Sequence, residues 1–247
     1  MDYSELENRA KILRRRTLDL GVEKIDAVHL GGAFSSIELL VSLYDVILRD
    51  KDTFILSKGH SCYPLYVLLR ERGYNPKIMG HPEIESKEGI YATTGSLGHG
   101  LPQSVGRAFA RKIKNEEGHI YVLLGDGEIQ EGTTWESSLF AVQHKLDNLT
   151  AIVDYNKIQG STYVNEVSPL GDLREKFKVL GWHTLEINGH SFGEIIPALK
   201  SIVEGKPAMV VAHTTKGKGV SFMENNPKWH GGVPQGGLLI KAYEELK

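Results

Sequence analysis

IYVLLGDGEIQEG, residues 120–132, joins a run of apolar residues to a glycine-rich turn that carries three carboxylates. An uninterrupted apolar run of this length predicts a strand buried on both faces, as in a parallel sheet covered by helices. Asp126, Glu128 and Glu131 crowd together directly after it, where like charges repel one another. Because ligands of open α/β sheets bind beyond the carboxyl ends of the strands, this turn predicts part of a binding site.

The same alternation of apolar runs and helical patterns extends along the chain. Strands are expected over residues 53–56, 120–125, 149–156, 183–187 and 208–214. Helices are expected over residues 4–20, 33–48, 61–73, 99–118, 133–146, 172–181 and 191–205, with a turn, HLGG, before the second helix. This order predicts one open, doubly wound α/β domain over residues 1–247, with a mostly parallel sheet and helices on both faces.

Four of the expected strands lead into polar, glycine-rich turns: SKGH, GDGEIQEG, NKIQG and TTKGKG. A right-handed crossover would bring Asp126 and Asn156, at the ends of adjacent strands, within reach of one ion. Their oxygens, together with a backbone carbonyl, are hard ligands that suit Mg²⁺ or Ca²⁺ beside a diphosphate. Either residue alone could simply cap or turn the chain, but the pair at this spacing favours a metal site.

The composition is that of a globular protein: 247 residues, 40% of them hydrophobic, with a net charge of −2. This balance favours neither nucleic acid nor a membrane surface as a partner, and RRR at residues 14–16 is interpreted as a solvated helix face. The single cysteine, Cys62, follows a histidine as a nucleophile could, but a packing residue at a helix start is preferred. The N-terminal residues lack an apolar signal core, so a cytoplasmic location is expected.

GDGEIQEGTTWESSLFAVQHKLDNLTAIVDYNKIQ, residues 125–159, resembles the thiamine diphosphate signature, which begins with GDG and ends about thirty residues later in an asparagine. QEG and the DNL before the next strand resemble transketolase in particular. Further similar stretches are HLGGAFSSIELL, ILSKGH, GHPE, TTGSLGHGL and TTKGKGVSFMENNPKWHG. The resemblance covers nearly the whole chain and implies the diphosphate-binding domain of the thiamine diphosphate fold, with a place in carbohydrate metabolism such as the pentose phosphate pathway.

The resemblance also implies ligands for a cofactor and a metal ion. Mg²⁺, with Ca²⁺ or Mn²⁺ as substitutes, would be bound by Asp126, Asn156 and the backbone carbonyl of Ile158. Thiamine diphosphate would lie against a larger set of residues: His60, Gly95, Ser96, Leu97, Gly127, Asn156 and His230.

Catalytic roles follow from the same resemblance. His29, His81 and His230 would face a sugar phosphate substrate, where imidazoles can bind hydroxyls and move protons. Glu131, in QEG, would lie where the two halves of the active site meet. Glu128 has no implied role and is interpreted as a solvated turn residue. The chain reads GSLGHG where transketolases usually read GPLGQG, and His99 there is interpreted as a residue at a helix N-terminus.

Thiamine diphosphate serves as an electron sink, and in this family a glutamate from a second, pyrimidine-binding domain activates it. That domain and the C-terminal domain are expected to be absent from these 247 residues. The resemblance therefore implies the N-terminal subunit of a split transketolase. It would transfer a two-carbon ketol unit from a ketose phosphate to an aldose phosphate, within a heterotetramer of two chains of each kind.

Several alternatives remain open. Another thiamine diphosphate enzyme, such as a deoxyxylulose-phosphate synthase or a decarboxylating dehydrogenase component, would share the fold, although SKGH, QEG and WHG favour transketolase. A split transketolase for an unusual sugar fits the same motifs. A noncatalytic cofactor-binding module has no physical reason to keep the whole set of polar residues. A Rossmann nucleotide binder is disfavoured, since no G-x-G-x-x-G opens a helix after the first strand.

Overall fold

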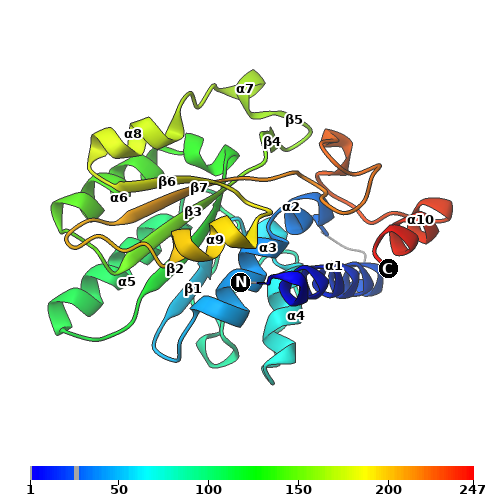
Figure 1. Cartoon of the computed structure of the whole chain (residues 1–247), viewed down its shortest axis with the longest axis horizontal. Coiled ribbons are helices and arrows are strands. Elements are labelled where there is room, and N and C mark those ends of the chain that lie inside the picture. The colour runs from blue at the N-terminus through cyan, green and yellow to red at the C-terminus, as the bar shows by residue number, and fades with distance from the viewer. Residues whose placement is uncertain (1, 25–27) are drawn as a thin grey trace.

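The computed structural model describes residues 2–24 and 28–247, and its centre is a five-stranded sheet (Figure 1). In spatial order the strands are β1 (Thr53–Leu56), β2 (Ile120–Gly125), β3 (Leu149–Tyr155), β7 (Ala208–His213) and β6 (His183–Asn188). All four neighbouring pairs are parallel. The predicted α/β fold is confirmed, and every predicted strand lies within one residue of its observed bounds.

Helices cover both faces of the sheet (Figure 1). The buried residues of one face form a single cluster with those of α1 (Ser4–Lys24), α2 (Leu30–Ser35), α3 (Ile37–Ser42), α4 (Tyr63–Glu71) and α9 (Phe192–Leu199), and α1 packs on α3 and α4. The other face packs against α5 (Gly100–Lys114), α6 (Gly132–Gln143) and α8 (Leu173–Leu180). None of the helices among the described residues combines the length and apolar character needed to cross a bilayer.

The central strands are apolar on both sides because each side is buried under helices. In β2, Val122 and Leu124 belong to the same buried cluster as Val153 of β3, whereas Leu123 belongs to the opposite cluster with Ile152. This alternation explains why the strand reads as a continuous apolar run rather than as apolar residues separated by polar ones.

The order of the strands creates a switch point between β3 and β7. The chain moves from β1 through β2 to β3, crosses to the far edge at β6, and returns to place β7 beside β3. The helices between β2 and β3 and between β3 and β6 lie on one face, while α9, between β6 and β7, lies on the other. Connections that leave on opposite faces open a crevice at the carboxyl ends of such strands, where ligands bind.

The predicted turn HLGG is wrong, because its glycines belong to α2, which begins at Leu30. A side chain on Gly31 would place its Cβ 2.3 Å from the carbonyl oxygen of Trp229, and one on Gly32 would place it 2.6 Å from the Ser61 hydroxyl. These glycines permit close packing of a helix against two loops rather than a turn. The expected helix over 33–48 is divided into α2, α3 and a π-helical turn, η1 (Leu43–Ile47).

Several short elements had not been predicted. They are a small hairpin of β4 (Ile158–Gln159) and β5 (Thr162–Tyr163), the helices α7 (Val164–Val167) and α10 (Gly237–Glu245), and the 3₁₀ turns η2 (Gly59–Ser61), η3 (Ser86–Glu88), η4 (Gly127–Gln130) and η5 (Pro227–Trp229). Cys62 is fully buried at the start of α4, where its thiol lies 3.3 Å from the carbonyl of Met79, as the packing interpretation predicts.

Candidate functional site

A cavity of about 330 Å³ lies at the carboxyl ends of β1, β2, β3 and β7, next to the switch point. The residues that line it come from the turns after these strands and from loops around the rim: His29, Lys58, His60, His81, Gly95, Leu97, Gly125, Asp126, Gly127, Glu128, Asn156, Ile158, Gln159, Gly160, Lys216 and His230. The fold thus brings together most of the predicted site residues from positions as far apart as 29 and 230.

The predicted metal ligands lie on this cavity wall and keep unused lone pairs. Asp126 accepts hydrogen bonds from the N–H groups of Gly127, at 2.8 Å, and Lys157. The side-chain oxygen of Asn156 accepts the N–H of Ile158 at 3.1 Å. Each carboxylate, amide or carbonyl oxygen has two lone pairs, so one bond at each leaves room for a metal ion.

A positive charge is already accommodated at this position. The Lys216 ammonium donates to the carbonyl oxygen of Ile158 at 3.1 Å and lies 2.9 Å from Nδ1 of His230. Burial raises the pKa of Asp126 to about 7, and the nearby Asp154 carboxylate adds to this effect. A divalent cation would compensate both carboxylates, so the oxygen set fits Mg²⁺.

Two buried lysines, Lys58 and Lys216, form the cationic part of the cavity, and sequence reasoning assigned neither. Lys58 pairs with the carboxylate of Asp154 and donates to the carbonyl of Gly32 at 2.9 Å. Burial, followed by the charge of Lys58, lowers the pKa of Lys216 to about 8. The available signal was that each lysine stands in a polar turn directly after a strand, in SKGH and TTKGKG.

Four histidines converge at the rim. The ring centre of His29 lies 5.5 Å from that of His60, 6.2 Å from His81 and 5.3 Å from His230. Burial, with the charge of Lys216 as the next cause, lowers the pKa of His230 to about 3. Burial and the charge of Lys58 hold the pKa of His60 well below its usual value. Neutral imidazoles can both accept and donate hydrogen bonds, which suits them to the hydroxyls of a sugar.

Glycines bring the backbone close to the cavity. Gly95 has a φ of +135°, and a Cβ there would lie 2.8 Å from the ring of His81. A Cβ on Gly127 would lie 2.3 Å from Oε1 of Gln159. Both positions require glycine, and their bare backbone can approach a phosphate.

Glu128 is not the solvated turn residue that the sequence indicated. Its side chain is buried, and its carboxylate accepts hydrogen bonds from the Ser57 hydroxyl and from the N–H groups of Gly98, at 2.9 Å, and Gly125, at 3.2 Å. The three donors belong to the turn after β1, the loop before α5 and the last residue of β2. Glu128 therefore ties together three of the segments that surround the cavity.

Two predicted residues lie outside the cavity lining. Ser96 is exposed beside it, and Glu131 is exposed at the start of α6. His99 occupies the position just before α5, as the sequence indicated, and its Nδ1 lies 2.9 Å from the carbonyl oxygen of Leu97. The structure thus separates Ser96 and Glu131 from the inner group of site residues.

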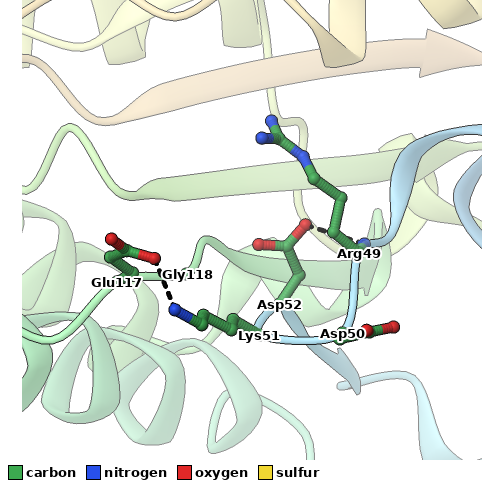
Figure 2. A pocket seen from close by; sticks show the side chains of 6 residues that line it. All are labelled: Arg49, Asp50, Lys51, Asp52, Glu117 and Gly118. Carbon is green, nitrogen blue, oxygen red and sulfur yellow. Dashed lines mark hydrogen bonds and ion pairs between the residues drawn. The ribbon is translucent and has the colours of Figure 1, made fainter.

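A second depression, of about 600 Å³, lies at the opposite edge of the sheet, before β1 and β2 (Figure 2). Its larger volume does not make it the better site, because two of its charged side chains pair with each other and the Asp52 carboxylate is occupied by backbone N–H groups. Lys51 pairs with Glu117 at 2.6 Å (Figure 2), and the Asp52 carboxylate accepts the N–H groups of Arg49 and His119. We therefore place the candidate site at the carboxyl edge.

Comparison with known sequences gives concordant matches. Residues 8–237 match the family described as "Transketolase, thiamine diphosphate binding domain". An apulose-4-phosphate transketolase subunit from Actinobacillus succinogenes is 39% identical over 100% of this chain and 98% of its own. A 6-deoxy-6-sulfo-D-fructose transketolase subunit from a Clostridium species is 36% identical over 92% of this chain and 90% of its own.

Solved structures agree with these sequence matches. A transketolase from Campylobacter jejuni superposes on 100% of this chain with a TM-score of 0.87 and 30% identity. A transketolase from Leishmania mexicana superposes on 98% with a TM-score of 0.89 and 26% identity. This chain covers 43% and 41% of those two chains.

Proposed function

Because this chain belongs to the transketolase family of thiamine diphosphate binding domains, we propose that it is the diphosphate-binding subunit of a split transketolase. The observation that carries the proposal is the cavity at the switch point, where Asp126, Asn156 and the Ile158 carbonyl face the buried Lys58 and Lys216. An oxygen-lined cation site next to two ammonium groups fits the magnesium salt of a diphosphate.

In this proposal the chain's own groups divide the task of holding the cofactor. Asp126, Asn156 and the Ile158 carbonyl hold Mg²⁺, and the backbone of Gly127 approaches the diphosphate. Lys58 and Lys216 add positive charge at the floor of the cavity. When bound, thiamine diphosphate supplies the electron sink on which two-carbon transfer depends.

The remaining proposed cofactor contacts come from the rim. His60, Gly95, Leu97 and His230 line the cavity, and Ser96 stands beside them. Their arrangement supports the assignment of this wall to the cofactor, with the glycine leaving space for it.

The rim histidines support a sugar phosphate as substrate. His29, His81 and His230 present imidazoles around one opening, and the low pKa of His230 keeps that ring neutral at physiological pH. Neutral rings of this kind can donate hydrogen bonds to, and accept them from, the hydroxyls of a ketose phosphate donor and an aldose phosphate acceptor. The relatives of matching length are named for apulose 4-phosphate and for 6-deoxy-6-sulfo-D-fructose, which supports an unusual sugar with a phosphate or sulfonate group over a general pentose phosphate role.

A second kind of chain is part of the proposal. Relatives of matching length are named as subunits of transketolases, which implies that they work with a further subunit. We propose that this second subunit carries the pyrimidine-binding domain and the activating glutamate, in an assembly of two chains of each kind. The exposed Glu131, at the start of α6, would lie against it. A cytoplasmic location stays a prediction.

The test is reconstitution with the protein encoded by the neighbouring reading frame. The two chains, purified separately and mixed with thiamine diphosphate and Mg²⁺, should transfer a two-carbon ketol unit between sugar phosphates, whereas this chain alone should show no turnover. Turnover by this chain alone, after rigorous purification, would refute the two-chain assignment. Calorimetry with thiamine diphosphate and Mg²⁺, in the presence and in the absence of the second subunit, then distinguishes the proposed enzyme from a noncatalytic module. The module would bind no cofactor in either case.

A further inference from the structure

Arg14 is buried, which corrects the interpretation of RRR as a solvated helix face. Arg15 and Arg16 are exposed, but Arg14 points from α1 into the protein and meets Glu38 of α3. Its Nη2 lies 2.6 Å from Oε1 and 2.7 Å from Oε2 of that carboxylate. Pairing and hydrogen bonding of this kind offset the cost of burying a carboxylate.

Glu38 also contacts His190, which lies in the loop between β6 and α9. His190 Nδ1 is 3.0 Å from Oε2 of Glu38, and the histidine side chain is only 16% exposed. Burial acts to raise the pKa of Glu38, but the hydrogen bond from His190 and the charge of Arg14 outweigh it and lower that pKa. Glu38 is therefore an ionised acceptor, so the ring nitrogen that faces it carries a hydrogen.

The other ring nitrogen of His190 faces the chain that leads into the active site. The backbone N–H of Thr215 donates to Nε2 of His190 at 2.8 Å. An N–H group needs an acceptor, so Nε2 must carry a lone pair and no hydrogen. The two contacts together assign one neutral tautomer to His190, with its hydrogen on Nδ1.

Thr215 immediately precedes Lys216, whose ammonium lies on the floor of the cavity. The loop of His190 is fixed to the same strand end, because Gly189 donates to the carbonyl of His213 at 2.8 Å. We propose that His190 is a positioning residue: held in its Nδ1–H tautomer by Glu38 and Arg14, it fixes the Thr215 backbone and thereby the approach of Lys216 to an anionic ligand. The proposal rests on the diphosphate-binding role given above.

Three substitutions separate this role from simple packing. In His190→Gln the amide oxygen can take the place of Nε2 and accept the Thr215 N–H. In His190→Asn the amide nitrogen can take the place of Nδ1 and face Glu38, but nothing reaches Thr215. His190→Leu fills the space and supplies neither contact. Each is compared with wild type as the full 247-residue chain.

Binding of thiamine diphosphate with Mg²⁺ is measured by calorimetry, together with the midpoint of thermal unfolding. Because a buried N–H left without an acceptor costs more than a typical hydrogen bond gains, affinity should fall about tenfold or more in His190→Asn and His190→Leu. His190→Gln should stay within about threefold of wild type. Equal losses in all three variants, or none in any, would overturn the proposal.

Nitrogen chemical shifts of the imidazole and hydrogen exchange at the Thr215 amide provide a readout that needs no cofactor. The expected result is the Nδ1–H tautomer in wild type and faster amide exchange in His190→Asn than in His190→Gln. The opposite tautomer, or equal exchange in the two variants, contradicts the positioning role. If wild type binds no cofactor either alone or with the second subunit, the proposed function fails, while these measurements still decide whether His190 fixes Thr215.

Discussion

The carboxylate of Glu128 accepts the backbone N–H of Gly98 at 2.9 Å and so joins the turn after β2 to the loop before α5. The same carboxylate reaches Ser57 and Gly125, so one buried side chain links three segments around the candidate site. Because Glu128 and Gly125 also line the cavity, these bonds fix part of its wall.

We expect Glu128→Gln to destabilise the chain and to weaken cofactor binding. Glutamine presents an NH₂ group to donors that require an acceptor, which costs about 1–3 kcal/mol of unfolding free energy for each group left unsatisfied. Chemical unfolding and calorimetry with thiamine diphosphate and Mg²⁺ measure the two effects. Glu136→Gln, at an exposed position of α6, is the matched control. Equal stability of the two variants would contradict the linking role.

Asp126→Ala should abolish the gain in thiamine diphosphate affinity that Mg²⁺ provides. The substitution removes the only carboxylate of the proposed metal set, and the remaining amide and carbonyl oxygens bind a divalent cation weakly. Titrations with and without Mg²⁺ give the gain directly. Asp50→Ala serves as a control, because this exposed aspartate lies at the opposite edge of the sheet (Figure 2). An unchanged gain in Asp126→Ala would exclude the metal assignment.

Sequence patterns located the strands closely because burial on both faces leaves a continuous apolar run, as in β2. The presence of Asp126 and Asn156 at one cavity could also be predicted, because each residue follows one of two adjacent parallel strands. The burial of charged side chains could not be predicted from the sequence, because it depends on partners that are distant along the chain. Arg14 meets Glu38, and Glu128 meets Ser57 and Gly98, only once the helices and loops are packed.

The glycines of HLGG were misread for a related reason. Their local pattern is typical of a turn. A glycine is needed at position 31 because a side chain there would collide with the carbonyl of Trp229, almost two hundred residues later in the chain. Lys58 and Lys216 were overlooked because lysines are mostly exposed, and only the topology of the sheet turns these two into the floor of a cavity.

Lys216→Met should weaken diphosphate binding without destabilising the free chain. The ammonium is desolvated in the cavity, which already lowers its pKa to about 8, and methionine removes that cost. A charge-assisted hydrogen bond contributes about 1.5–3 kcal/mol, so affinity should fall by about tenfold or more. Lys218→Met, at a partly exposed position in the same loop, should bind like wild type. A large loss of unfolding free energy in Lys216→Met would indicate a structural role instead.

Stability should fall as the pH drops from about 6.5 to about 4 because of His119. Burial lowers the pKa of this residue to about 4, and its Nε2 lies 2.8 Å from the Thr150 hydroxyl. Between these values the unfolded chain binds more protons than the folded chain, so the stabilisation is present above pH 6.5 and lost below it. The loss amounts to up to about 3 kcal/mol. In His119→Gln the unfolding free energy, measured by chemical unfolding at several pH values, should depend less steeply on pH. An unchanged pH dependence would contradict the role given to His119.

Glu131→Ala should weaken association with the proposed second subunit while leaving the isolated chain intact. The carboxylate is exposed, and the backbone of Glu131 precedes α6 with no side-chain hydrogen bond to the start of that helix. Removal of an exposed carboxylate therefore changes unfolding free energy by no more than about 0.5 kcal/mol. Loss of a charge at an interface between the two chains should raise the dissociation constant by severalfold, measured by analytical ultracentrifugation of the mixed chains.

Glu136→Ala, at another exposed position of α6, controls for general effects of charge. Equal association by both variants would place the interface elsewhere on the chain.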